Sequence, residues 1–171
     1  MNKVVIVVYV FLLIVGLSGC TQIEIDREYI NTEHGFALNP PEEWNVAENV
    51  TEEVVVCFSS PLRDDVCLNI STLYRLDIGL ALSVFADDIE EQYLEIVDNF
   101  TVVYRDWRDI EGLTAYEIVY AYEEGDTSIK AIQVAVIKSR TVFRISFIAT
   151  NELYDEYISP VNQSIDSFKI V

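Results

Sequence analysis

Residues 102–150 decide the fold, and they read VVYRDWRDIEGLTAYEIVYAYEEGDTSIKAIQVAVIKSRTVFRISFIAT. Apolar and polar residues alternate in four runs, and short segments rich in Asp, Glu, Gly and Ser separate the runs. This pattern predicts an antiparallel meander of four strands, which run Val102–Arg108, Leu113–Tyr122, Ile129–Lys138 and Val142–Thr150.

The second of these strands is apolar on both of its faces. Tyr116, Ile118 and Tyr120 fall on one face, and Ala115 and Val119 fall on the other. A sheet with one face in water would show polar residues at every second position. We therefore expect helices to cover both faces of the sheet.

Two segments that flank the meander have the apolar spacing of three and four residues that is typical of amphipathic helices. The first covers residues 80–98 and the second covers residues 151–168. Pro160 is expected to kink the second helix, or to start a new segment capped by Ser159.

Two cysteines lie upstream, in β-rich runs on either side of a turn segment at residues 59–65. A hairpin that is symmetric about Leu62 places Cys57 opposite Cys67, at a distance that a disulfide accepts. The alternative is a pair of free, buried thiols that act as small apolar residues.

The N-terminus has the features of an exported protein. Lys3 precedes an uninterrupted apolar run at residues 4–15, which is shorter than the ~20 residues that span a bilayer. Leu17-Ser18-Gly19-Cys20 follows and resembles the lipobox of prokaryotic lipoproteins, in which the cysteine is lipidated. We predict a signal peptide at residues 1–19, lipidation of Cys20, an acidic tether at residues 20–28 and a single domain at residues 29–171. An uncleaved N-terminal anchor is the alternative, and either arrangement puts the domain at the cell membrane, on its extracytoplasmic side.

Composition excludes several classes of protein. The 171 residues carry 29 acidic and 11 basic side chains, and 51% are hydrophobic, a share too high for an intrinsically disordered chain. A net charge of −18 argues against nucleic-acid binding, which needs clustered Lys and Arg. The single histidine, His34, rules out metal sites with two His ligands and would have to serve any nucleophilic triad. We expect it to be a solvated turn residue.

Three further patterns have low specificity. Acidic pairs could serve glycoside hydrolysis, but 29 acids produce such pairs by chance. Calcium is the one cofactor that the acidic runs suggest, although none of them has the spacing of an EF-hand loop. The tyrosines of the second meander strand could form a platform for a sugar or peptide, or could pack in the core. Four Asn-X-Ser/Thr sequons are also present, at Asn49, Asn69, Asn99 and Asn162.

Three motifs in order resemble the PsbP-like family, named for an extrinsic protein of photosystem II. They are the opening Gly35-Phe36 to Trp44, the segment Gly112-Leu113-Thr114-Ala115 at the start of a meander strand, and the closing Ile165-Asp166-Ser167-Phe168. The resemblance implies an α+β fold, an α/β/α sandwich around a mainly antiparallel sheet. We expect about six strands in that sheet.

The family resemblance implies an accessory role in the assembly or retention of membrane complexes. We therefore expect a non-catalytic binding or assembly protein without a cofactor, whose partner is a membrane or envelope protein. The alternative is an envelope hydrolase, or a protein that binds a small ligand or divalent cation in an acidic or Tyr-lined cleft.

Overall fold

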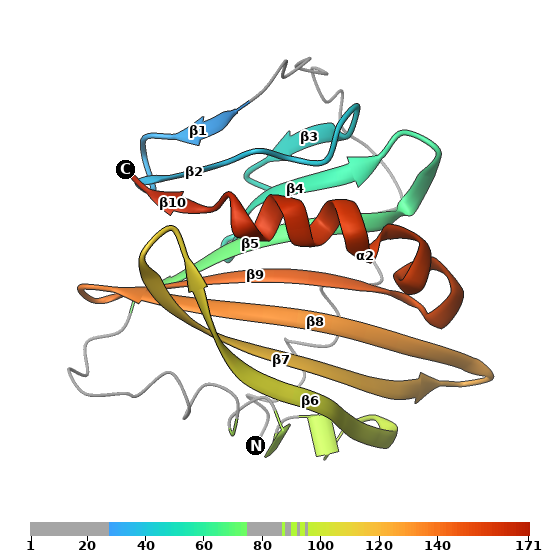
Figure 1. The fold of residues 1–171 in the computed structure, drawn as a ribbon. Coiled ribbons are helices and arrows are strands. Elements are labelled where there is room, and N and C mark those ends of the chain that lie inside the picture. The colour runs from blue at the N-terminus through green and yellow to red at the C-terminus, as the bar shows by residue number, and fades with distance from the viewer. Residues whose placement is uncertain (1–27, 75–86, 88–89, 92, 95) are drawn as a thin grey trace.

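The computed structural model describes residues 28–74, 87, 90–91, 93–94 and 96–171. The elements of this part of the chain are β1 (Tyr29–Asn31), β2 (Phe36–Leu38), β3 (Asn45–Glu48), β4 (Val54–Ser60), β5 (Arg63–Tyr74), β6 (Asp98–Ile110), β7 (Leu113–Glu124), β8 (Thr127–Lys138), β9 (Thr141–Thr150), α2 (Asn151–Asp166) and β10 (Lys169–Ile170). Seven strands form one antiparallel sheet in the order β3-β4-β5-β9-β8-β7-β6 (Figure 1). A smaller antiparallel sheet has the order β1-β2-β10.

The predicted meander is confirmed as β6 to β9. Its first hairpin closes with Ile110 paired to Leu113, and the two residues between them, Glu111 and Gly112, have φ values of 51° and 79°. A two-residue turn with positive φ at both positions matches the right-handed twist of the strands that it joins. The strands are longer than predicted, and the sheet has seven strands where we expected about six.

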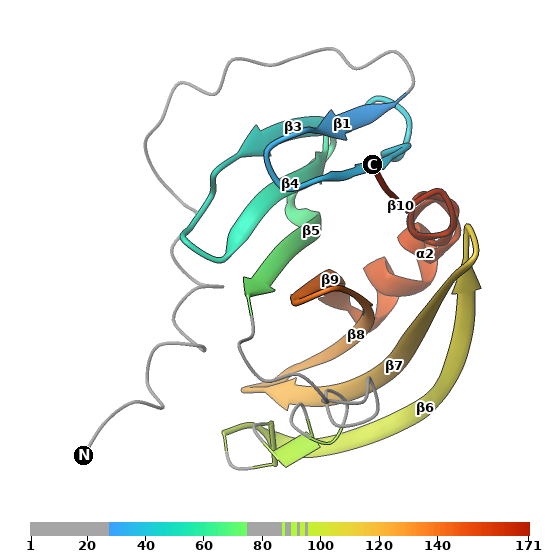
Figure 2. The same ribbon diagram turned by 90° about the vertical axis from the view of Figure 1, so that its left-hand side faces the viewer.

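Helix α2 covers one face of the large sheet, which curves around it (Figure 2). Its apolar stripe is the predicted one, with Tyr154, Val161 and Ile165 buried. Together with Phe147 and Phe168, these side chains form the main hydrophobic core between helix and sheet. Pro160 lies inside the helix, so the predicted restart at that residue is wrong.

The expectation of helices on both faces is wrong for the described part of the chain, in which α2 is the only complete helix. In the described part of the chain, the face opposite α2, called here the outer face, carries a cluster of aromatic rings, of which Tyr93 comes from the segment predicted as the first helix. Tyr93 and Phe100 pack on Tyr120 with ring centroids 5.0 and 5.5 Å apart. These large side chains bury the outer-face positions of β7 that we expected a helix to cover. Of the helix predicted at residues 80–98, the described residues Asp87, Glu90, Glu91, Tyr93 and Leu94 are helical, and most of the others lie outside the described residues.

The small sheet brings the two ends of the domain together. β2 pairs with β1 on one side and with β10 on the other, and Phe36 at its start is fully buried. Phe36 stacks on Phe168, with 5.8 Å between the ring centroids, just beyond the end of α2. β2 ends at Leu38, before Pro40, as the proline predicts.

Candidate functional site

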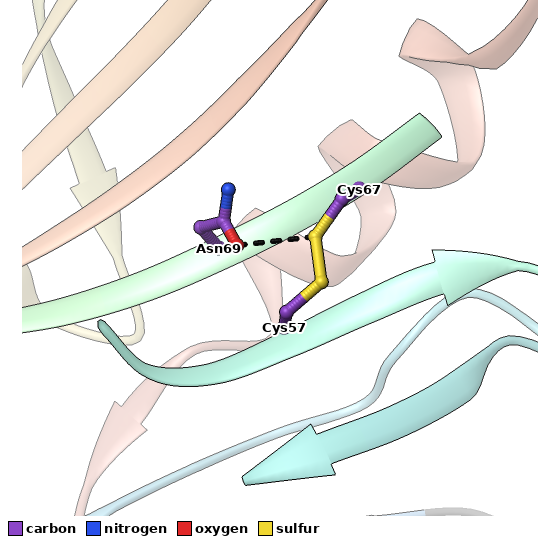
Figure 3. Close-up of a disulfide and its surroundings, with 3 residues drawn as sticks. All are labelled: Cys57, Cys67 and Asn69. Carbon is purple, nitrogen blue, oxygen red and sulfur yellow. Dashed lines mark hydrogen bonds between the residues drawn. A yellow bond between two sulfur atoms is a disulfide. The ribbon is translucent and has the colours of Figure 1, made fainter. Parts of the chain in front are cut away.

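The two predicted cysteine sites differ in what the structure shows of them. Cys20, the predicted lipidation site, lies outside the described residues. Cys57 and Cys67 form a disulfide between β4 and β5, with their Cα atoms 6.1 Å apart (Figure 3). The predicted register is wrong by two residues, because Ser59 pairs with Cys67 and Cys57 pairs with Asn69. A bulge between Ser59 and Ser60 shifts the strands, so the cysteines are diagonal neighbours on the outer face.

Neither the single histidine nor the acidic runs form a reactive cluster in the described residues. His34 lies in the turn between β1 and β2, with its Nδ1 atom 3.4 Å from Oγ1 of Thr72 and its backbone N–H bonded to Asn31. None of these contacts supplies a carboxylate. Within the described parts of the chain, no three His, Cys, Asp or Glu residues come together as a metal site would require.

The tyrosines of β7 pack in the core and do not form an open platform. Tyr120 is fully buried, Tyr116 is 8% exposed, and Tyr122 is half-buried beside Tyr93. Burial raises the pKa of Tyr120 well above its ordinary value. Its hydroxyl accepts a hydrogen bond of 2.8 Å from Nε2 of Gln133, which holds both side chains in place.

A row of polar side chains crosses the outer face. Gln133 pairs with Ser146 and Ser146 with Asn69, and both Gln133 and Ser146 are buried. In the next row, Arg144 donates a hydrogen bond of 3.0 Å to Ser71. Oε1 of Gln133 has no hydrogen-bond partner in the described structure. Buried polar groups are normally paired, so the unpaired Oε1 of Gln133 is an exception in this row, which lies beside the aromatic cluster.

A network of charged side chains ties β6 to α2. Nη1 of Arg108 lies 2.5 Å from Oε2 of Glu117 and 3.2 Å from Oδ1 of Asn162, and Nη2 lies 2.6 Å from Asp166. The hydroxyl of Tyr104 donates a hydrogen bond to the other oxygen of Glu117.

The network also shifts the pKa values of two of its members. The pKa of Arg108 is raised although burial alone would lower it, because the hydrogen bonds to Asp166 and Glu117 outweigh burial. Burial, together with the bond to Glu117, raises the pKa of Tyr104 to about 12. Both shifts move the pKa values of Tyr104 and Arg108 further from physiological pH, at which Tyr104 is neutral and Arg108 is charged.

β6 is the end strand of the large sheet, and it carries three exposed apolar side chains. Val103, Tyr104 and Trp107 are 52%, 48% and 54% exposed. The register places Tyr104 on the α2 side, where it pairs with Val119, and Trp107 on the outer face, where it pairs with Tyr116. Val103 is the extra residue of a bulge. The exposed groups thus flank the free edge of the strand from both faces of the sheet.

The rings at this edge are held in fixed positions. Trp107 meets Tyr116 edge to face, with the ring centroids 4.9 Å apart. Tyr104 is held by Glu117, as described above. Fixed, half-exposed aromatic side chains of this kind are enriched at protein interfaces.

The sequence does not predict this edge as a site. It does contain a usable signal, because Arg105, Asp106, Arg108 and Asp109 put charges on both faces of one strand. Charges on both faces of a strand, among them inward-pointing ones, mark the edge of a sheet. Trp107 stands out as an aromatic residue inside that charged run.

The four sequons fall into two groups. Asn49 and Asn99 are exposed and occupy left-handed backbone positions, with φ of 53° at both. Asn69 lies inside β5 beside the disulfide, and Asn162 accepts a hydrogen bond from Arg108. Nδ2 of Asn99, the atom that would carry a glycan, donates a hydrogen bond of 2.6 Å to Glu123, so among the four sequons Asn49 is the most open to modification in the folded protein.

The sequence matches the PsbP family over residues 26–170. The chain belongs to the PsbP family. Its fold is similar to that of cyanobacterial PsbP (CyanoP) from Synechocystis sp. PCC 6803, with a TM-score of 0.65, 17% identity and coverage of 92% of this chain and 99% of that one. A comparison with curated protein sequences gave no match.

Two further structures share the PsbP fold at low identity. LpqN of Mycobacterium tuberculosis, described as involved in cell envelope biogenesis, matches with a TM-score of 0.58 and 12% identity over 80% of this chain and 83% of that one. PA94 of Pseudomonas aeruginosa, described as a putative regulator of unknown function, matches with a TM-score of 0.54 and 14% identity over 81% and 92%. Within the described residues of this chain, no helix is long and apolar enough to cross a membrane.

Proposed function

We propose that this PsbP-family protein is a lipoprotein that is tethered to the outer side of the cell membrane and serves there as a non-catalytic binding or assembly accessory. The observation that carries the proposal is the order of its parts. An apolar run and the sequence Leu17-Ser18-Gly19-Cys20 stand directly before a short acidic segment and a single PsbP domain. Two acyl chains on one cysteine suffice for stable anchoring, whereas one chain alone is marginal.

Two comparisons support an accessory role at the envelope. LpqN has the same fold and is described as involved in cell envelope biogenesis. Members of the PsbP family are generally accessory proteins and not enzymes, and this chain matches the family over almost the whole of its proposed mature part. The disulfide between Cys57 and Cys67 also suits an exported domain, because disulfides persist in oxidising compartments.

Substitution of the lipobox cysteine tests the anchor. In cells that carry the Cys20→Ser variant, we expect loss of radiolabelled palmitate incorporation, together with release of the protein from the membrane fraction or accumulation of its unprocessed precursor. The matched control is the Cys57→Ser/Cys67→Ser double variant, which loses two cysteines outside the lipobox and should keep both the label and the membrane fraction. Unchanged labelling and fractionation of Cys20→Ser would refute the lipoprotein.

Chemical crosslinking and pull-down of the full-length protein from its native membranes tests the accessory role. The proposal expects one or a few membrane or envelope proteins at constant stoichiometry, and expects the same proteins after mild and after stringent washing. Recovery of the protein alone, with hydrolysis of an envelope substrate by the purified chain, would overturn it in favour of an enzyme.

A further inference from the structure

The edge of β6 combines an unpaired strand with exposed aromatic side chains in the described part of the chain. β6 has 13 residues and is paired on one side only, with β7, in the described sheet. An unpaired edge presents a row of backbone N–H and C=O groups, which is a template for a further strand. Three of the large exposed apolar side chains of the described chain, Val103, Tyr104 and Trp107, lie on this one strand.

The placement of these side chains fits an added strand better than it fits a flat contact. Side chains of an incoming strand would alternate between the two faces of the sheet. Tyr104 lies on the α2 side and Trp107 on the outer face, so an added strand could contact one aromatic side chain on each face of the sheet. Addition of a strand to a sheet edge gains affinity from main-chain hydrogen bonds and specificity from alternate side chains.

The charges at the edge decide what kind of strand it would accept. Both arginines of β6 are already paired, Arg105 with Asp87 and Glu90, and Arg108 with Glu117 and Asp166. The exposed acids of the strand, in contrast, have no ion pair among the described residues; they are Asp98, Asp106 and Asp109. The edge is therefore acidic in a chain whose net charge is −18. A second copy of this chain would be repelled, whereas lysines and arginines would be attracted and could also lie over the exposed rings.

We propose that the β6 edge binds an extended, basic segment of a partner protein, in which Lys or Arg alternates with apolar residues, by antiparallel or parallel strand addition. This proposal rests on the accessory role proposed above, and it identifies the β6 edge as the surface that binds the partner. The occupant is a protein segment and not a lipid, since a row of backbone donors and acceptors is complementary to another backbone.

Synthetic peptides test this site directly with the full-length protein in detergent. The probe is a fluorescent ten-residue peptide that alternates Lys and Val, and its binding is followed by anisotropy. We expect saturable binding, and at least a tenfold loss of affinity for three altered peptides: one with Glu in place of Lys, one with the lysines and valines in separate blocks, and one with every backbone amide methylated. Equal binding of the methylated peptide would overturn strand addition, and a concentration-dependent dimer formed through β6 would show that the occupant is a second copy.

Matched variants locate the site on the protein. Trp107→Ala should weaken binding of the Lys–Val peptide at least tenfold, and Val103→Lys should do the same by placing a like charge beside the peptide lysines. Leu62→Ala is the control, because Leu62 is 82% exposed in the turn between β4 and β5 and lies away from β6. Circular dichroism establishes that each variant is folded. Unchanged binding by folded Trp107→Ala and Val103→Lys would overturn the proposal.

The tests of the β6 site and the tests of the proposed function can fail independently of each other. Loss of anchoring in Cys20→Ser does not affect peptide binding by the purified protein. Conversely, failure of peptide binding together with recovery of a stoichiometric envelope partner would leave the accessory role standing and would reject the β6 edge as its surface.

Discussion

The two ends of the seven-stranded sheet are built in opposite ways. At one end the edge strand β3 has only four residues, its Val46 is buried, and the small sheet lies beside it (Figure 1). Tyr29 of β1 packs edge to face on Phe58 of β4 at 5.2 Å and donates a hydrogen bond to Glu48 of β3. At the other end β6 has 13 residues and exposed aromatic side chains. Among the described residues, one edge is thus short and covered, and the other is long and unpaired on its outward side.

The two ends are also held by different kinds of bond. β4 and β5 are joined covalently by the disulfide, whereas β6 is fastened to α2 by the ion pairs of Arg108. A disulfide withstands changes of salt concentration and pH but is broken by a reductant. Ion pairs are weakened by salt and by changes of pH, and a reductant does not affect them. The β6 edge is thus fastened on the α2 side by ion pairs, and its outward side has no strand partner among the described residues.

The largest effect on this arrangement is expected from Arg108→Met. The change leaves Glu117, whose side chain is only 10% exposed, without its cation. Removal of one partner from a buried ion pair lowers the free energy of unfolding by about 3–5 kcal/mol. Because this pair is still partly exposed, we expect a loss of about 3–4 kcal/mol. Urea denaturation measures the free energy of unfolding.

Arg105→Met is the matched control for that substitution. Arg105 also pairs with two acids, but its side chain is 45% exposed. Exposed ion pairs contribute about 0–1 kcal/mol, so this variant should remain close to the unaltered protein. Equal losses for the two variants would show that the Arg108 network does not support β6.

Removal of the disulfide should have a smaller effect, at the opposite end of the sheet. Cys57→Ala/Cys67→Ala opens a loop with a sequence separation of 10 residues. Closure of a loop of that length by a disulfide contributes about 2–3 kcal/mol to the free energy of unfolding. The loss should appear in urea denaturation, and treatment of the unaltered protein with a reductant should reproduce it. Hydrogen exchange should become faster in β4 and β5 and stay unchanged in β6; faster exchange at β6 alone would contradict the division into two ends.

Much of the fold follows from local patterns in the sequence. The alternation over residues 102–150 and the turn residues between its runs predict the meander, and the apolar spacing from Asn151 onward predicts α2. The pairing of Cys57 with Cys67 follows from two β-rich runs around one turn. These features depend on residues that are close together in the chain.

The remaining features depend on register and on side-chain size. The bulge at Ser59 and Ser60 displaces the cysteine hairpin by two residues, and nothing in its composition reveals it. On the outer face, large aromatic side chains from β6 and β7 pack with Tyr93, which comes from the segment predicted as the first helix, and their size is not apparent from the alternation. The contact of Arg108 with Glu117 arises because Asp106, two residues before Arg108, pairs with Glu117 across the hairpin, and only the finished ladder fixes that diagonal. The open edge of β6 likewise follows from the strand order and not from any motif.

Site-specific photocrosslinking in native membranes tests the central claim, that the β6 edge is the surface on which this protein binds its partner. A photoreactive amino acid replaces Val103 in one full-length chain and Leu62 in another, and the adducts are sequenced by mass spectrometry. The account predicts a discrete adduct from position 103, joined to a segment in which Lys or Arg alternates with apolar residues, and no adduct from position 62. An adduct from position 62 alone, or one from position 103 to a segment without basic residues, would contradict it.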